Sequence, residues 1–266
     1  MKHFMYAGLA ALLLTGCSLS AQDQPAKTDQ QKPQSASQKK NTADSGDKKS
    51  ASELQLAARY FNKTKTVEGK QVIQNPSNIL ALVNKTYILG DYVPKDLVRP
   101  NVQFSFGDQD IEKSYLRKPA AQALEEMFAA AKQDGIDLFM ASGYRSYSRQ
   151  KNVFDAESQK VGEEQAEQAV AIPGQSEHQT GLAADITSHA ENFLLTQKMG
   201  EDKEGIWLAK NAHQYGFILR YPKNKERITK YEYEPWHFRY VGKKAAAVIY
   251  KHGWTLEEYF QHVKKI

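Results

Sequence analysis

The most informative segment of the 266-residue chain reads SEHQTGLAADI, from Ser176 to Ile186. The small and apolar residues from Gly181 onward predict a strand, and His178 lies in the glycine-flanked loop before it. Asp185 falls within the predicted strand, where a carboxylate is disfavoured unless another group compensates its charge. A bound metal ion would provide that compensation.

A second segment, EPWH, carries a carboxylate and an imidazole three residues apart, at Glu234 and His237. Pro235 restricts the residue before it to an extended backbone. A strand is predicted to begin at His237. The two side chains can therefore share one site.

Zinc gives a chemical reason for this set of residues. A catalytic zinc takes three ligands of the His or carboxylate type and keeps one position open. His178, Asp185 and His237 would supply two nitrogens and one oxygen, and Glu234 would act as the general base. The spacing alone is explained equally well by two structural histidines and an Asp185 that caps a turn.

The pattern around these segments predicts a single α+β domain without internal repeats. After Pro119, apolar residues recur at helical spacing as far as Ala131, and Gly135 is placed to end the helix. Further strands are expected at 79–83, 137–141, 181–186, 217–221 and 237–241. Further helices are expected from Ser148, at 163–170 as an exposed acidic face or a flap near the site, at 206–215 and at 244–263.

The start of the chain resembles a lipoprotein signal. A short basic stretch and an apolar run from Phe4 to Leu14, too short to span a bilayer, precede the quartet LTGC, which ends at Cys17. LTGC resembles the lipobox of bacterial lipoproteins. The resemblance implies a signal peptide at 1–16, lipidation of Cys17 and an extracytoplasmic protein anchored to the cell membrane. An ordinary secretory signal is the alternative.

Composition separates the next segment from the folded domain. Residues 18–52 contain one Leu and no aromatic residue, which predicts that the lipidated Cys and a disordered tether occupy 17–52. The folded domain is expected at 53–266. Residues 1–52 hold seven Lys and four Asp of a chain whose net charge is +5, so the domain is nearly neutral. A nucleic-acid partner is therefore not expected.

Three motifs together resemble the peptidoglycan zinc carboxypeptidases of the VanY and LdcB type. They are SGYRSYSRQ (142–150), SEHQTGLAADI (176–186) and EPWHFRYVG (234–242). The resemblance covers roughly residues 78–263, with the motifs in the family's order and spacing. It implies one Zn²⁺ per chain, held on a small antiparallel sheet that helices flank.

The resemblance also assigns roles to residues. It implies metal ligands at His178, Asp185 and His237, a catalytic glutamate at Glu234, and a substrate-binding arginine at Arg145. A guanidinium suits the carboxylate at the end of a peptide because it donates two parallel hydrogen bonds. The expected reaction removes the C-terminal D-Ala from peptidoglycan stem peptides.

Weaker candidates for substrate contact lie beside these residues. They are Ser142, Gln150, Ser176 and Trp236. His189 is the one plausible substitute ligand, although it follows the predicted strand.

Several alternatives stay open. The resemblance covers both D,D- and L,D-carboxypeptidases, which act on pentapeptide and tetrapeptide stems respectively. A non-catalytic peptidoglycan-binding lipoprotein and an endopeptidase that cuts cross-links are the other functions considered, and Arg145 argues against the second of these. We expect a monomer that is attached to the membrane through the lipid anchor at Cys17.

Overall fold

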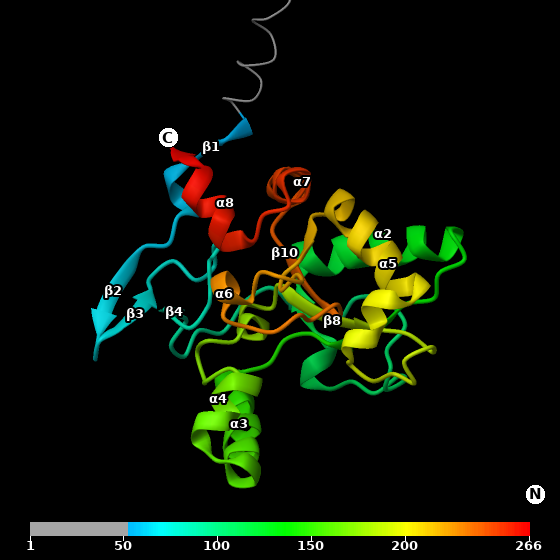
Figure 1. The fold of residues 1–266 in the computed structure, drawn as a ribbon, viewed down its shortest axis with the longest axis horizontal. Helices are drawn as coiled ribbons and strands as arrows, with labels where there is room; N and C mark the ends of the chain where they lie inside the picture. Colours follow the sequence, from blue (N-terminus) through cyan, green and yellow to red (C-terminus); the bar gives the residue numbers. More distant parts are fainter. Residues whose placement is uncertain (1–52) are drawn as a thin grey trace, which may run out of the picture. The chain divides into compact units, whose positions relative to one another are not determined.

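The centre of the structure is a four-stranded antiparallel sheet (Figure 1), seen in a computed structural model that describes residues 53–266. Its strands, in spatial order, are β7 (Phe139–Ser142), β8 (Ala183–Thr187), β10 (His237–Tyr240) and β9 (Phe217–Leu219). In the register of β8 and β10, His237 lies directly opposite Asp185. Two segments more than fifty residues apart therefore place their polar side chains together.

The two faces of this sheet differ because side chains alternate along a strand. Ala184, Ile186 and Phe238 lie in the main hydrophobic core. That core also takes residues of α2 (Lys118–Gln133) and α5 (Lys203–Asn211). The alternate residues, which include Asp185 and His237, point away from this core. The sheet thus has one face for packing and one for chemistry.

Helix α2 follows the sequence prediction closely. Pro119 stands at its start, where the missing N–H costs nothing, and Leu124 and Met127 are fully buried on its inner face. The helix ends at Gln133, and Gly135 turns the chain with a φ of +73°. Burial of its apolar stripe fixes α2 against the sheet.

Two helices, rather than one helical region, close the chain. They are α7 (Lys243–His252) and α8 (Leu256–His262). Gly253 separates them with a φ of +62°, and Thr255 starts α8 by accepting a hydrogen bond from the backbone N–H of Glu258. Val248 and Leu256 of these helices belong to a second buried core.

The strand expected at 79–83 is not present, which corrects the prediction. The segment is buried, but side chains satisfy its backbone in place of a neighbouring strand. Arg239 donates to the carbonyl oxygens of Ile79 (3.1 Å) and Ala81 (2.9 Å), and Asn62 bonds both the N–H and the C=O of Leu82. An apolar run shows that a segment is buried, and it does not show what satisfies the backbone.

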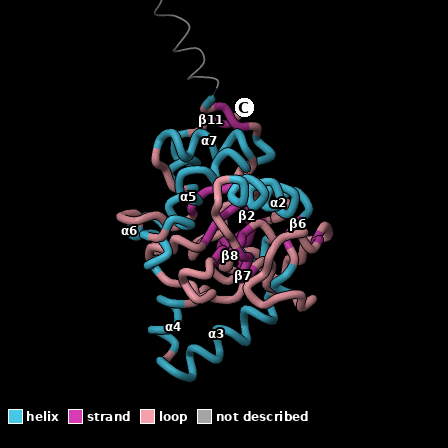
Figure 2. The backbone as a smooth tube through the Cα atoms, turned by 90° about the vertical axis from the view of Figure 1, so that its right-hand side faces the viewer, coloured by secondary structure: helices cyan, strands magenta, loops and turns pink. Residues whose placement is uncertain are grey.

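The helical hairpin of α3 (Tyr147–Val161) and α4 (Glu163–Ala169) stands away from the sheet (Figures 1 and 2). Ser146 caps α3 by accepting from the backbone N–H of Arg149 (3.2 Å). Gly162, with a φ of +89°, makes the turn between the helices. The acidic residues of α4 are exposed, as the sequence predicts for its polar face.

Smaller sheets border the domain. A hairpin with positive φ at Glu68 and Gly69 joins β2 to β3, and sequence patterns predict nothing for this region. These strands are β2 (Thr64–Val67), β3 (Lys70–Ile73) and β4 (Tyr87–Ile88), then the pairs β5 (Leu97–Val98) with β6 (Leu116–Arg117) and β1 (Gln55–Leu56) with β11 (Lys264–Lys265).

The remaining helical elements are single short turns. They are η1 (Ala58–Tyr60), η2 (Glu112–Ser114), η3 (Glu177–Thr180), η4 (Gln197–Glu201), η5 (Ala212–Tyr215) and α6 (Glu226–Thr229). Within residues 53–266, no helix has the length and apolar character needed to cross a membrane. The predicted signal peptide, Cys17 and the tether lie outside the described residues.

Candidate metal centre

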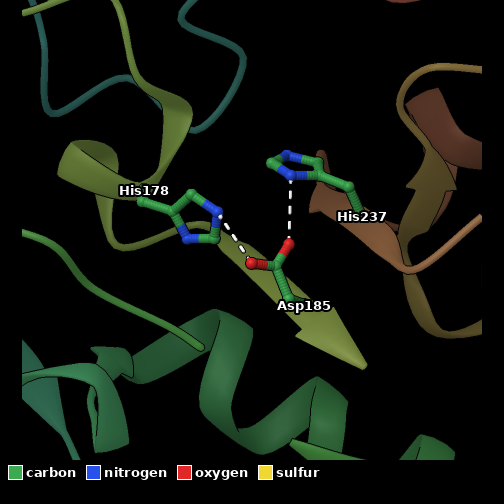
Figure 3. Close-up of side chains that lie close together, drawn as sticks. All are labelled: His178, Asp185 and His237. Carbon is green, nitrogen blue, oxygen red and sulfur yellow. Dashed lines mark ion pairs between the residues drawn. The ribbon is translucent and has the colours of Figure 1, made fainter. Parts of the chain in front are cut away.

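The structure brings three of the predicted residues together on the polar face of the sheet (Figure 3). His178 comes from η3, Asp185 from β8 and His237 from β10, and all three are buried. One ligand atom of each lies within 4.8 Å of the others. Nε2 of His178 and Nδ1 of His237 are each 3.2 Å from an oxygen of the Asp185 carboxylate.

These separations suit a tetrahedral cation. Zinc bonds nitrogen and oxygen at about 2.0–2.1 Å, which places two ligands of a tetrahedron about 3.3 Å apart. Oδ1 of Asp185 makes no hydrogen bond to any described residue, although it is buried and lies close to His237. An ionised oxygen without a donor is costly in the interior. The donor set and the spacing fit one zinc ion.

The backbone around His178 fixes which of its nitrogens faces the cluster. Its Nδ1 lies 2.7 Å from the carbonyl oxygen of Gly143, which can only accept, so Nδ1 carries the proton and Nε2 is left as a ligand. A side chain at Gly143 would meet the backbone oxygen of Tyr115 at 2.4 Å. Glycine is therefore required there for the chain to pass close to the backbone of Tyr115.

The electrostatics of the cluster favour positive charge at its centre. Burial would raise the pKa of Asp185, but the two imidazoles outweigh it and hold that pKa well below its usual range. Burial lowers the pKa of His178, because it disfavours the charged imidazolium. Burial would also lower the pKa of His237, but the adjacent carboxylates of Asp185 and Glu177 outweigh it and raise that pKa to about 9. The carboxylate stays ionised and draws a cation to itself.

Glu234 lies beside the cluster without belonging to it. Its Oε2 is 3.6 Å from Nδ1 of His237, and its side chain retains 23% of its exposure. Its backbone N–H donates to the carbonyl oxygen of Tyr221, and its own carbonyl accepts from the N–H of His237. Burial, followed by nearby carboxylates, raises its pKa to about 7. A carboxylate that gains and loses a proton near neutrality suits a general base.

Arg145 faces the same cavity, which has a volume of about 220 Å³. Its guanidinium donates to Oε1 of Gln150 (3.0 Å) and to Oγ of Ser142 (3.5 Å). No carboxylate among the described residues forms a salt bridge with it. Arg145 is thus a cation aimed at a cavity without an anion of its own.

The weaker substrate-contact candidates have different positions. Gln150, Ser176 and Trp236 lie on the wall of the cavity. Ser142 pairs with Asp185 in the register of β7 and β8, accepts from the guanidinium of Arg145 and lines the neighbouring cavity. His189 packs against Phe139 and Phe193, with ring centres 4.6 and 4.8 Å away, and is not a ligand in this arrangement.

Among the cavity-lining residues that sequence reasoning did not single out, three are titratable. Glu177, next to a predicted ligand, is fully buried beside His237. The ring of Tyr221 packs against the ring of His237 at an interplanar angle of 47°, and Tyr231 has a buried hydroxyl without a hydrogen-bond partner among the described residues. Only the adjacency of Glu177 to His178 was visible in the sequence.

Together these groups can carry out one kind of chemistry. The cluster can hold a single cation, a carboxylate with a raised pKa lies at its edge, and an arginine faces it across the cavity. Such a combination activates water and orients an anionic substrate. The fold and the site thus define a hydrolase of the metallopeptidase class.

Comparison with known proteins narrows this class. The family model described as VanY, D-alanyl-D-alanine carboxypeptidase, matches residues 113–243. The chain is 53% identical over 265 residues to YodJ of Bacillus subtilis (strain 168), assigned as a carboxypeptidase, covering 97% of this chain and 94% of that protein. The chain belongs to the VanY family of D-alanyl-D-alanine carboxypeptidases and is a carboxypeptidase.

Two solved structures show the same fold. The LD-carboxypeptidase LdcB is 59% identical with a TM-score of 0.78, covering 80% of this chain and 100% of its own. A variant of the vancomycin-resistance D,D-pentapeptidase VanY, in complex with Zn(II), is 35% identical with a TM-score of 0.53, covering 68% of this chain and 98% of its own. The expected family and fold class are thereby confirmed.

Proposed function

We propose that this chain is a zinc carboxypeptidase that removes the C-terminal D-Ala from peptidoglycan stem peptides. The convergence of His178, Asp185 and His237 within 4.8 Å, with Glu234 beside them, is the observation that carries the proposal. The Zn(II) of the VanY structure and the peptidoglycan recognition ascribed to LdcB support it. A purely binding protein would have no need of the glutamate.

Within this proposal, each residue has a defined task. When bound, zinc supplies a Lewis acid that polarises a carbonyl and makes water nucleophilic near neutral pH. Glu234 takes the proton from the attacking water and returns it to the departing amine, since its carboxylate lies at the edge of the cluster. Both steps lie within reach of a single carboxyl group.

Arg145 binds the free carboxylate at the end of the peptide. Gln150 and Ser142 accept hydrogen bonds from its guanidinium and so fix its orientation. Buried Gln150 is itself anchored, because its amide donates to the carbonyl oxygen of Ala171 (2.6 Å). A closed carboxylate-binding wall favours removal of one terminal residue over cleavage of cross-links.

Of the two stereochemical specificities, we propose L,D cleavage of tetrapeptide stems. The chain is more similar to the LD-carboxypeptidase than to the D,D-pentapeptidase, in both identity and TM-score. Val153 of α3 and Leu195 supply apolar side chains to the cavity wall, and we expect the two substrates to differ in their contacts with this wall.

The proposed location is extracytoplasmic, with lipid on Cys17 anchoring a monomer to the cell membrane. The LTGC quartet and the polar tether at 17–52 support this proposal. Mass spectrometry of Cys17 in the membrane fraction would test it, and an unmodified Cys17 in a chain cleaved elsewhere would reject it. A peptidase at this location would reach stem peptides of the cell wall directly.

The decisive experiment replaces Glu234 with alanine. Zinc content should stay at one per chain, while release of D-Ala from a synthetic tetrapeptide stem should fall by about 10²–10⁴-fold. Wild-type protein assayed on pentapeptide and tetrapeptide stems serves as the reference and reports the specificity. Undiminished D-Ala release by Glu234→Ala would rule out the assigned role.

A further inference from the structure

Glu177 is a buried carboxylate next to Nε2 of His237, whereas Asp185 lies next to Nδ1 of the same ring. Its side chain is fully buried. Oε1 accepts from Nε of Arg220 (2.8 Å) and from Nη1 of Arg239 (2.7 Å). Oε2 has no hydrogen-bond partner among the described residues, and it lies 3.5 Å from Nε2 of His237, which also has none. The two unpartnered atoms face each other.

When a metal ion is bound at Nδ1, the neutral ring of His237 can carry its proton only on Nε2. Nδ1 points toward Asp185 at 3.2 Å, so a cation held there needs the lone pair of Nδ1. A neutral imidazole carries one N–H, which must then sit on Nε2 and point toward Glu177. Metal-binding histidines generally donate their second N–H to an acceptor of this kind.

The orientation of Glu177 is fixed by two arginines. Arg220 and Arg239 are fully buried, and each donates to the same oxygen of Glu177. Arg220 is itself held by two hydrogen bonds to the carboxylate of Glu257, and Arg239 by the carbonyl oxygens of Ile79 and Ala81. Because Oε1 is occupied twice, only Oε2 is available to His237.

We propose that Glu177 is a positioning residue, whose Oε2 accepts the Nε2–H of His237 and so directs Nδ1 toward the metal. The inference deepens the proposed zinc-dependent function and rests on it. Glu177 differs in task from Glu234, because Glu234 approaches the opposite nitrogen of the same ring, at 3.6 Å from Nδ1. Glu177 orients the metal ligand His237, and Glu234 transfers protons.

The Glu177→Gln variant tests the proposal because it keeps the shape of the side chain and replaces one acceptor oxygen with an NH₂ donor. Arg220 and Arg239 only donate, so they retain the amide oxygen and turn the amide NH₂ toward His237. That NH₂ requires a lone pair on Nε2, which moves the imidazole proton to Nδ1. We expect zinc affinity, measured on the full chain by competition with a chelating dye, to fall about 10–100-fold.

Glu258→Gln is the matched control. Glu258 lies on α8, where its carboxylate pairs with Lys225 and accepts from the backbone N–H of Thr255, and among the described residues it forms no ion pair with Arg220 or Arg239. The control should lose stability and keep wild-type zinc affinity. Equal loss of zinc affinity in both variants, or wild-type affinity in Glu177→Gln, would overturn the proposal.

Nitrogen-15 NMR of the histidines gives a readout that a purely structural role would not move. In the zinc-loaded wild-type chain, the proton of His237 is expected on Nε2, and its absence there contradicts the proposal even if Glu177→Gln does not fold. D-Ala release is measured in parallel on the wild type. A wild type that releases no D-Ala, but whose zinc affinity depends on Glu177, would reject the proposed function and retain the positioning role.

Discussion

Two buried charged clusters adjoin at His237, and they differ in how their charges are compensated. The cluster of Glu177, Arg220, Arg239 and Glu257 contains two cations and two anions that pair with one another. In the cluster of His178, Asp185 and His237, the carboxylate contacts only imidazoles, and no Arg or Lys among the described residues forms an ion pair with it. Buried charge alone is structural, whereas uncompensated buried charge indicates a ligand.

Metal removal should have the largest effect and bears directly on the uncompensated cluster. Dialysis against a chelator should abolish D-Ala release, and the chain should lose about 4 kcal/mol of unfolding free energy relative to protein in zinc at a thousand times its dissociation constant. Calorimetry with and without chelator measures the change, and added zinc should restore both properties. Full activity in the metal-free chain would contradict the difference drawn between the clusters.

The substitution Arg220→Met removes one cation from the compensated cluster of Glu177, Arg220, Arg239 and Glu257. It leaves Glu177 and Glu257 buried without their shared cation, so we expect a loss of about 3–5 kcal/mol of unfolding free energy in urea titrations. Lys151→Ala is the comparison, because it removes an exposed pair with Asp155 and should cost under about 0.5 kcal/mol. Similar small losses in both variants would mean that the buried cluster contributes little stability.

The pH dependence of the metal-free chain should reveal the charge of Glu234. Burial raises its pKa from 4.5 to about 7, so the folded chain holds a proton that the unfolded chain has lost between these values. Stability therefore falls as pH rises through this window, by on the order of 3 kcal/mol for this group. Relative to wild type, Glu234→Gln should lack that part of the slope. A slope equal in both proteins would show that Glu234 is already ionised.

Arg145→Lys has the smallest expected effect and tests a cation that lacks an anion of its own. Lysine keeps the charge and loses the two parallel donors, so KM for a tetrapeptide stem should rise about tenfold, which corresponds to about 1.4 kcal/mol, with kcat little changed. Steady-state kinetics at saturating zinc measure both constants. A fall in kcat at constant KM would place Arg145 at the reacting carbonyl and away from the terminal carboxylate.

The predictable parts of the fold are those that depend on local pattern. Helix α2 follows from its apolar spacing, and strands β8 and β10 follow from short apolar runs around Asp185 and His237. The strand expected at 79–83 was wrong because the partner of its backbone is a distant side chain, Arg239. Long-range hydrogen bonds of this kind leave no local signal.

The candidate site likewise has a part that the sequence predicts and a part that only the structure shows. The five principal residues stand in motifs, and the structure places His178, Asp185 and His237 together with Glu234 and Arg145 around one cavity. Their roles stay predictions until the variants are measured. The task inferred for Glu177 could not be predicted, because it depends on which oxygen the two arginines occupy, and that is fixed only in three dimensions.

The link from Glu257 through Arg220 to Glu177 has a practical consequence for shortened forms of the protein. The family match ends at residue 243, yet Glu257 lies beyond it on α8. A truncation there would remove no residue that lines the cavity, but it would release one end of the arginine that orients Glu177. We therefore expect the smallest portion that binds zinc at native strength to include α8, and an inactive fragment without α8 would not count against the proposed activity.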